Sequence, residues 1–253
     1  MTFALDPSPA PAPAGIKAVC LDLDETLLDV EHASRSALRE LVGTDRAWPV
    51  WQRITDQHYA RYVTDEIGFD AMCVERTKAF FAAFGESLDD AEAACRESLR
   101  MAAMQRSWRL FDDVRPCLDW LAATGLRLAV VTNAPGGYQR KKISAVGLAA
   151  DFDAVVVSGE VGVAKPDPRI FRTACERLGL RPDEVAHVGD RLGTDARGAS
   201  RAGLHGIWLN RHREECESAG VPAITDLDEL PELLVADLVL GTAMEPDRLT
   251  PAR

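Results

Sequence analysis

Short, almost uninterrupted apolar runs recur along the chain and alternate with segments of helical periodicity. A strand that is buried on both faces of a parallel sheet carries such a run, because neither side of it meets water. Five segments have this pattern: IKAVCLDLD (16–24), LRLAVVTN (126–133), FDAVVVSG (152–159), EVAHVGD (184–190) and HGIWLN (205–210). Helical patterns occupy residues 112–125, 136–146, 166–180, 193–203 and 226–234. The alternation predicts an α/β fold with a doubly wound, mainly parallel sheet.

One long segment breaks this alternation. Residues 30–110 contain no strand pattern, and their apolar residues recur at helical spacing in 32–42, 50–63, 70–84 and 88–104. About eighty residues are too many for a simple loop, so the pattern predicts a helical domain inserted after the first strand. The predicted α/β core therefore comprises residues 16–29 and 111–240. The aromatic residues of the insertion are expected to form its own core: Trp48, Trp51, Phe80, Phe81 and Phe84.

The two ends of the chain differ from both domains. Residues 1–15, MTFALDPSPAPAPAG, alternate Pro and Ala, which predicts a disordered tail. The polar, proline-containing residues 241–253 predict a second tail that frays. The first segment lacks the basic start and long apolar stretch of a signal peptide, and no apolar run reaches the roughly 18 residues of a membrane-spanning helix. We therefore expect a cytoplasmic protein without a membrane partner.

Composition and charge narrow the range of partners. The chain has 253 residues, of which 47% are apolar and 27% charged, as in ordinary globular proteins. Its 29 basic and 40 acidic residues give 29 − 40 = −11, a charge that repels nucleic acid and anionic lipid. The six cysteines form no CxxC pair, which predicts buried or half-buried free thiols in a reducing compartment. The five histidines lack HxxxH and HExxH spacing, which argues against a histidine-built zinc site.

Polar side chains gather where the predicted strands end. They are Asp22 and Asp24 at the end of the first strand, Thr132 and Asn133 at the end of the second, Lys165 in the loop after the third, Asp190 at the end of the fourth, and Asp195 in the next loop or helical turn. In open α/β sheets, ligands bind at this edge. Close carboxylates are costly without a cation, and a few carboxylate oxygens suit Mg²⁺. A carboxylate at a strand tip can attack phosphorus, and a second one two residues later can act as acid and base.

The segments DLDETL, VVTN, VAKPDPRIF and GDRLGTD resemble, in order and spacing, the four motifs of the haloacid dehalogenase superfamily. The resemblance covers about Ile16 to Leu240 and implies a Rossmann-like core with a small α-helical cap over residues 30–110, which closes over the site and sets substrate choice. Because Asp24 is retained, it also implies phosphoryl chemistry rather than the dehalogenase branch, which needs no metal. A narrower similarity is to nucleotidase-like and N-acylneuraminate-9-phosphatase-like members.

The resemblance also implies a role for each motif residue. Asp22 looks like the nucleophile and Asp24 like the general acid and base, while Asp22, the main-chain carbonyl of Asp24, and Asp190 look like Mg²⁺ ligands. The remaining matches are Thr132 and Asn133 in the phosphate-binding motif, Lys165 as the lysine that steadies nucleophile and phosphate, and Asp195 as a metal ligand through water or a partner of the ligands.

The predicted function is a Mg²⁺-dependent phosphatase that hydrolyses a small phosphorylated metabolite through an aspartyl phosphate. Phosphotransfer by a phosphomutase of the same superfamily is an alternative, and a non-enzymatic phospho-accepting domain is another. For Arg76, His58 and Arg61 of the insertion we expect a solvated helix face rather than substrate contact, and for Arg191 likewise. The sequence specifies neither the substrate nor the oligomeric state.

Overall fold

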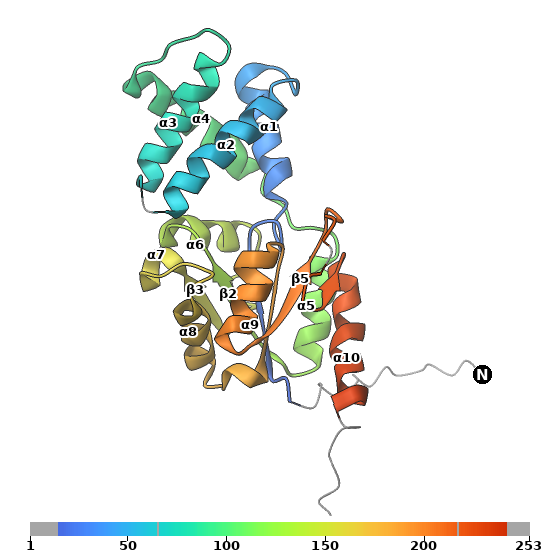
Figure 1. Cartoon of the computed structure of the whole chain (residues 1–253). Coiled ribbons are helices and arrows are strands. Elements are labelled where there is room, and N and C mark those ends of the chain that lie inside the picture. Colours follow the sequence, from blue (N-terminus) through green and yellow to red (C-terminus); the bar gives the residue numbers. More distant parts are fainter. Residues whose placement is uncertain (1–14, 65, 217, 242–253) are drawn as a thin grey trace, which may run out of the picture. The chain divides into compact units, whose positions relative to one another are not determined.

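The computed structural model describes residues 15–64, 66–216 and 218–241 (Figure 1). Apart from Gly15 and Gly241, both predicted tails lie outside these residues. The described chain divides into two compact units, one formed by Asp29–Arg109 and the other by the residues that precede and follow this segment.

The larger unit contains a six-stranded sheet in which every neighbouring pair is parallel. Its strands are β1 (Ala18–Leu21), β2 (Arg127–Thr132), β3 (Ala154–Val157), β4 (Val185–Gly189), β5 (His205–Leu209) and β6 (Ala223–Ile224). Their order is β3-β2-β1-β4-β5-β6. The predicted doubly wound α/β fold is therefore confirmed. The strand order reverses between β1 and β4, and in such sheets this switch point is where ligands bind.

Helices cover the sheet of the larger unit. They are α5 (Val114–Ala123), α6 (Gly136–Ala145), α7 (Ser158–Val161), α8 (Pro168–Leu178), α9 (Arg197–Ala202) and α10 (Leu230–Gly241), with short turns at Pro182–Glu184, Leu192–Ala196 and Leu227–Glu229. Helices α8 and α9 pack on one face, where Phe171 and Ile170 are fully buried against small sheet residues such as Ala18 and Ala129. Helix α5 contacts β2 and α10. Buried strands need apolar side chains on both faces, which explains the continuous runs of the sequence.

Asp113 holds the N-cap position of α5, but its side chain makes no capping hydrogen bond. Its carboxylate instead accepts hydrogen bonds from the Arg211 guanidinium and the Leu227 amide. A carboxylate that is 7% exposed gains more from a guanidinium than from a helix amide.

The smaller unit consists of four helices, which matches the periodicity of its sequence. They are α1 (Val30–Val42), α2 (Trp48–Val63), α3 (Phe69–Ala82) and α4 (Asp90–Arg106). Trp48, Trp51, Phe80 and Phe81 are buried in its core, and the Trp51 and Phe80 rings meet edge to face at 5.2 Å. The expectation for Phe84 is wrong: this residue is 59% exposed, because it lies beyond the end of α3, although its ring meets the Phe80 ring edge to face at 5.2 Å.

Arg76 also differs from the sequence expectation. It is 7% exposed and donates to Glu97 at 2.6 Å, so it does not lie on a solvated face. Arg100 binds the same carboxylate, and both guanidinium groups stack on Trp51, at 4.7 and 4.8 Å from its centroid. Arg61 forms ion pairs with Glu66 and Glu75 at the surface of the unit. The periodicity of α3 could not reveal that Arg76 is buried, because a buried guanidinium needs an anionic partner and that partner, Glu97, lies on another helix.

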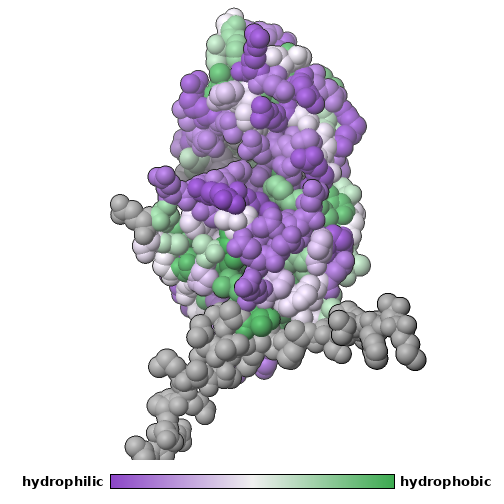
Figure 2. Space-filling model, turned by 90° about the vertical axis from the view of Figure 1, so that its right-hand side faces the viewer, coloured by the Kyte–Doolittle hydropathy of each residue, from purple (hydrophilic) through white to green (hydrophobic). Residues whose placement is uncertain are grey.

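The face of the molecule in Figure 2 is mainly hydrophilic. Hydrophilic residues cover most of the described surface in Figure 2, with hydrophobic groups between them. Among the described helices, none combines the length and apolarity needed to cross a membrane. All six cysteines are unpaired, as predicted; four are buried, whereas Cys95 and Cys216 are exposed, contrary to the expected burial.

Candidate active site

The loop after β1 carries the first two candidate residues. The amide of Asp22 donates to the carbonyl of Val188 of β4 at 2.9 Å, so the residue continues the sheet, and it is buried, at 6% exposed. The chain then turns back on itself: the amides of Leu27 and Leu28 both donate to the carbonyl of Leu23. The turn needs the left-handed conformation of Glu25, at φ 59°. As a result the Asp24 side chain lies in a separate, 31% exposed position.

Three carboxylates meet at the switch point of the sheet. Asp22 follows β1, Asp190 follows β4, and Asp195 lies in the turn after Asp190; each offers an oxygen within 4.8 Å of the others. Lys165 lies between two of them, with its Nζ 2.7 Å from Asp22 Oδ1 and 2.6 Å from Asp195 Oδ1. The lysine is 3% exposed. One buried ammonium therefore faces three acidic groups.

The electrostatics of this group leave negative charge uncompensated. Burial raises the pKa of Asp190 to about 8, with further increases from Asp22 and Asp195. Burial also raises the pKa of Asp22 to about 6, although Lys165 lowers it. Burial raises the pKa of Asp195 as well, but Lys165 and His187 together bring it below its ordinary value. For Lys165 itself, burial lowers the pKa, yet Asp195 and Asp22 outweigh burial and raise it above its ordinary value.

Asp195 is held from several sides. It lies in the π-type turn Leu192–Ala196, where its own amide donates to Arg191 at 2.8 Å and the Arg191 amide donates to its carboxylate at 3.2 Å. His187 Nε2 lies 3.2 Å from Asp195 Oδ1, in the fully buried interior. Gly189 allows the Asp195 carboxylate to lie against the end of β4, because a Cβ at position 189 would lie 2.5 Å from the Asp195 carboxyl carbon. The Arg191 side chain is exposed.

Thr132 and Asn133 end β2 beside this group, and their side chains have different partners. The Thr132 hydroxyl accepts a hydrogen bond from Gln139 at 2.7 Å, so its own proton is available to another acceptor. The Asn133 amide donates to the carbonyl of Lys165 at 2.9 Å and accepts from the Lys165 amide at 2.8 Å. Asn133 therefore fixes the backbone that carries the lysine, a role that its sequence position did not reveal.

Two residues of α6 join the site although the sequence interpretation passed over them. Lys142 Nζ contacts both carboxylate oxygens of Asp24, at 2.7 and 2.8 Å, and Gln139 Nε2 donates to Asp24 Oδ2 at 3.0 Å. Both residues are buried, at 2% and 0% exposed. Their spacing within a helical pattern was a usable signal, because Gln139, Lys142 and Ile143 stand at i, i+3 and i+4, so the two polar residues share a helix face with an apolar one.

The acidic group has the donors that a hard divalent cation prefers. Asp22, Asp190 and Asp195 supply only oxygen atoms, as Mg²⁺ sites do, and a cation would relieve the repulsion that raises the pKa of Asp190. The Asp24 carboxylate forms an ion pair with Lys142 and is not part of this acidic group. The sequence interpretation likewise assigned only the main-chain carbonyl of Asp24 to the metal. The sequence left open whether Asp195 touches the ion, and its oxygen lies within the acidic group.

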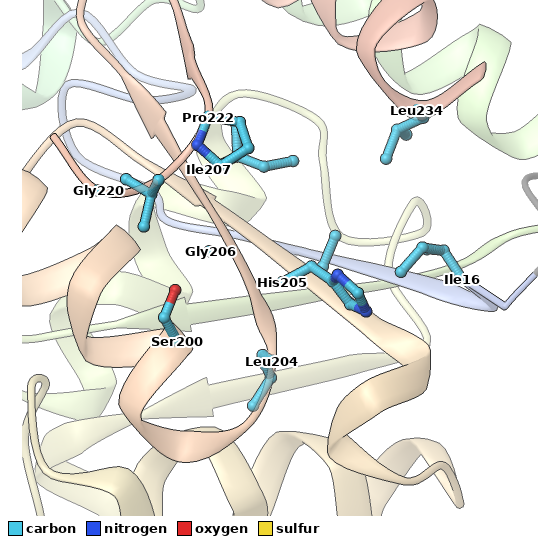
Figure 3. Close-up of a pocket in the computed structure, with 11 residues that line it drawn as sticks. Ile16, Ser200, Leu204, His205, Gly206, Ile207, Gly220, Pro222 and Leu234 are labelled. Atoms are coloured by element: carbon cyan, nitrogen blue, oxygen red, sulfur yellow. The ribbon is translucent and has the colours of Figure 1, made fainter. Parts of the chain in front are cut away.

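A separate pocket of about 220 Å³ lies at the other ends of the strands (Figure 3). It is lined by Ile16, which precedes β1, and by His205 and Ile207 of β5. Its polar groups already have partners: the Ser200 hydroxyl donates to a helix carbonyl, and His205 Nε2 lies 3.0 Å from the Asp183 carbonyl. The pocket contains none of the candidate residues and is smaller than most ligand sites, which reach roughly 300–1,000 Å³.

The chain is similar in sequence and in fold to known hydrolases. Residues 16–203 match the model of the haloacid dehalogenase-like hydrolase family. A phosphoserine phosphatase from Thermus thermophilus is 31% identical over 245 residues, covering 85% of this chain and 98% of the relative. The human N-acylneuraminate-9-phosphatase is 32% identical, covering 87% and 94%. Among solved structures, the magnesium-bound HAD-hydrolase YfnB from Bacillus subtilis has a TM-score of 0.76 at 24% identity, covering 87% and 98%, and so shares the fold.

Proposed function

This chain belongs to the haloacid dehalogenase-like hydrolases and is an enzyme of their phosphatase branch; we propose that it hydrolyses a small phosphorylated metabolite with Mg²⁺, through an aspartyl phosphate on Asp22. The observation that carries this proposal is the group of three carboxylates within 4.8 Å beside the buried Lys165 ammonium. The relatives act on different phosphomonoesters by name, which supports the reaction class and leaves the substrate open.

In the first half-reaction, a carboxylate oxygen of Asp22 attacks phosphorus opposite the leaving oxygen. A bond forms between Asp22 and phosphorus, and the ester P–O bond breaks with its electron pair on the leaving oxygen. Asp24 donates a proton to that oxygen. Lys165 holds Asp22 at 2.7 Å and adds positive charge beside the transferring group. The Thr132 hydroxyl has a proton to donate to a phosphate oxygen.

In the second half-reaction, the Asp24 carboxylate takes a proton from water as the water oxygen attacks the phosphorus of the aspartyl phosphate. The bond between phosphorus and Asp22 breaks, its electron pair returns to the carboxylate, and inorganic phosphate leaves. Asp24 then carries the proton that the next leaving group needs. The two steps together consume one water molecule and restore both aspartates.

The Mg²⁺ ion would be held by Asp22, Asp190 and the main-chain carbonyl of Asp24, with Asp195 as a direct ligand or a partner through water. When bound, it supplies positive charge against the phosphoryl oxygens. The oxygen-only donors and the raised pKa of Asp190 support this assignment. We propose a cytoplasmic location from the six unpaired cysteines. The net charge of −11 supports a small-molecule partner rather than nucleic acid.

The test uses purified protein with p-nitrophenyl phosphate and Mg²⁺. Asp22→Asn should lower turnover by at least about 10³-fold, whereas Asp119→Asn, the same change at an exposed position of α5, should not. EDTA should suppress turnover and added Mg²⁺ should restore it. A panel of phosphorylated amino acids, sugar acids and nucleotides then identifies the substrate. Full turnover by Asp22→Asn, or transfer of the phosphoryl group to a second hydroxyl without phosphate release, would refute the proposal.

A further inference from the structure

Helix α6 presents a pair of buried polar side chains to the site. Lys142 and Gln139 are three residues apart, on one face of the helix. The Asp24 carboxylate receives hydrogen bonds from both: Oδ1 accepts from Lys142 at 2.7 Å, and Oδ2 accepts from Lys142 at 2.8 Å and from Gln139 at 3.0 Å. Three hydrogen bonds on one carboxylate restrict its rotation, because any other rotamer breaks at least one of them.

The burial of this pair requires compensation. A lysine side chain that is 3% exposed loses its hydration, and a buried ammonium is costly unless it is paired. The ion pair with Asp24 supplies that compensation, and the Tyr138 ring lies 4.5 Å from the ammonium. An apolar residue at position 142 would fill the same space without this cost. The polar pair therefore has a purpose beyond packing.

Gln139 connects the carboxylate to the phosphate-binding motif. The same Nε2 atom that donates to Asp24 also donates to the Thr132 hydroxyl, at 2.7 Å. Since the hydroxyl accepts this bond, its proton points away from Gln139 and toward another acceptor. One amide thus aligns two groups that act on opposite ends of the same ester: Asp24 on the leaving oxygen and Thr132 on a phosphate oxygen.

Resting on the proposed function, we propose that Lys142 and Gln139 are positioning residues that hold Asp24 where it delivers a proton to the leaving oxygen. Neither residue touches the reacting atoms: Lys142 acts through Asp24, and Gln139 acts through Asp24 and the Thr132 hydroxyl. The effect of losing this positioning should depend on the leaving group. A p-nitrophenolate leaves without protonation, whereas an alkoxide needs a proton in the transition state. Loss of positioning should therefore slow the cleavage of alkyl phosphates much more than that of aryl phosphates.

The experiment compares kcat/KM for an alkyl phosphate and for p-nitrophenyl phosphate, since this parameter covers the steps up to phosphorylation of Asp22. Lys142→Met should lower kcat/KM roughly 10–100-fold for the alkyl phosphate, which is part of the 10²–10⁴ that an acid catalyst contributes, and about 3-fold or less for the aryl phosphate. Lys141→Met, the same change at the exposed neighbour, should alter neither. Lys142→Arg should recover part of the loss.

Two further variants make the result decisive. Gln139→Met should lower kcat/KM for both phosphates, because the Thr132 hydroxyl loses its donor, and should lower it more for the alkyl phosphate, because Asp24 loses one neutral hydrogen bond. In Asp24→Asn, which lacks the acid, adding Lys142→Met should cost little more, since the lysine acts through that carboxylate. Equal losses for both substrates, or full additivity with Asp24→Asn, would overturn the positioning role. A wild-type enzyme that cleaves neither phosphate would refute the proposed function and this inference with it.

Discussion

Removal of the Lys165 ammonium tests the electrostatic interpretation of the site most directly. In Lys165→Met, Asp22 and Asp195 lose the cation that lies 2.7 and 2.6 Å from them, while both carboxylates stay buried. Breaking a buried ion pair on one side costs about 3–5 kcal/mol. For a chain of this length, each kcal/mol lowers the unfolding temperature by about 2–4 °C, so we expect a decrease of roughly 6–20 °C.

The control has the same bond length but a different environment. Lys17 and Glu184 also form an ion pair at 2.6 Å, but the Lys17 side chain is 60% exposed. Because solvent screens exposed pairs, Lys17→Met should cost about 1 kcal/mol or less. The assay is thermal unfolding of the metal-free proteins, followed by circular dichroism. The proposed electrostatics are refuted if Lys165→Met unfolds no earlier than Lys17→Met.

The loss of stability in Lys165→Met should also depend on pH. Without Lys165, the folded-state pKa values of Asp22 and Asp195 rise. Their contribution to stability is then fully present below their unfolded pKa values and is lost as the pH rises through the raised folded-state values. The deficit of Lys165→Met relative to wild type should therefore be smaller at pH 5 than at pH 8. A deficit that does not change with pH would indicate that lost packing, rather than charge, causes the destabilisation.

Other predictions concern the metal, the insertion and the close approach at β4. Metal-free protein should lose thermal stability as the pH rises toward 8, because the pKa of Asp190 is raised to about 8 and its contribution to stability is present at low pH and lost near that value. Mg²⁺ at 100 times its Kd should add about 2.7 kcal/mol to the free energy of unfolding. An unfolding temperature that changes neither with pH nor with Mg²⁺ would contradict this. Glu97→Gln should destabilise the insertion by about 3 kcal/mol, since it leaves Arg76 buried without its anionic partner; denaturant unfolding that differs by less than about 0.5 kcal/mol would argue against it. Gly189→Ala should weaken Mg²⁺ binding measured by calorimetry, because the added Cβ would displace Asp195; wild-type affinity would show that the turn adapts.

Much of the fold follows from local sequence patterns. Strands with apolar residues on both faces and helices with one apolar stripe have different periods, and both periods are visible in the chain. They predicted the parallel sheet and the helical segment 30–110, for which the structure has four helices within Asp29–Arg109. The strand Ala223–Ile224 was missed because two residues carry no period.

The candidate residues Asp22, Thr132 and Asp190 could be chosen because each lies at the end of a predicted strand, and Lys165 because it lies in the loop after one; parallel strands end at one edge. Their individual partners could not be chosen this way. Asn133 holds the Lys165 backbone, a contact that depends on how two loops fold against each other.

The sequence alone determined which residue types reach the carboxyl edge of the sheet, because the hydrophobic period and the position of each strand's end are local properties of the chain. The tertiary structure decided which charges meet. Lys142 and Gln139 contact Asp24 across 118 and 115 residues, and Arg76 is buried by a partner on another helix. A buried charge is tolerated only where a partner lies within hydrogen-bond distance, and that distance is set by packing between elements far apart in the chain.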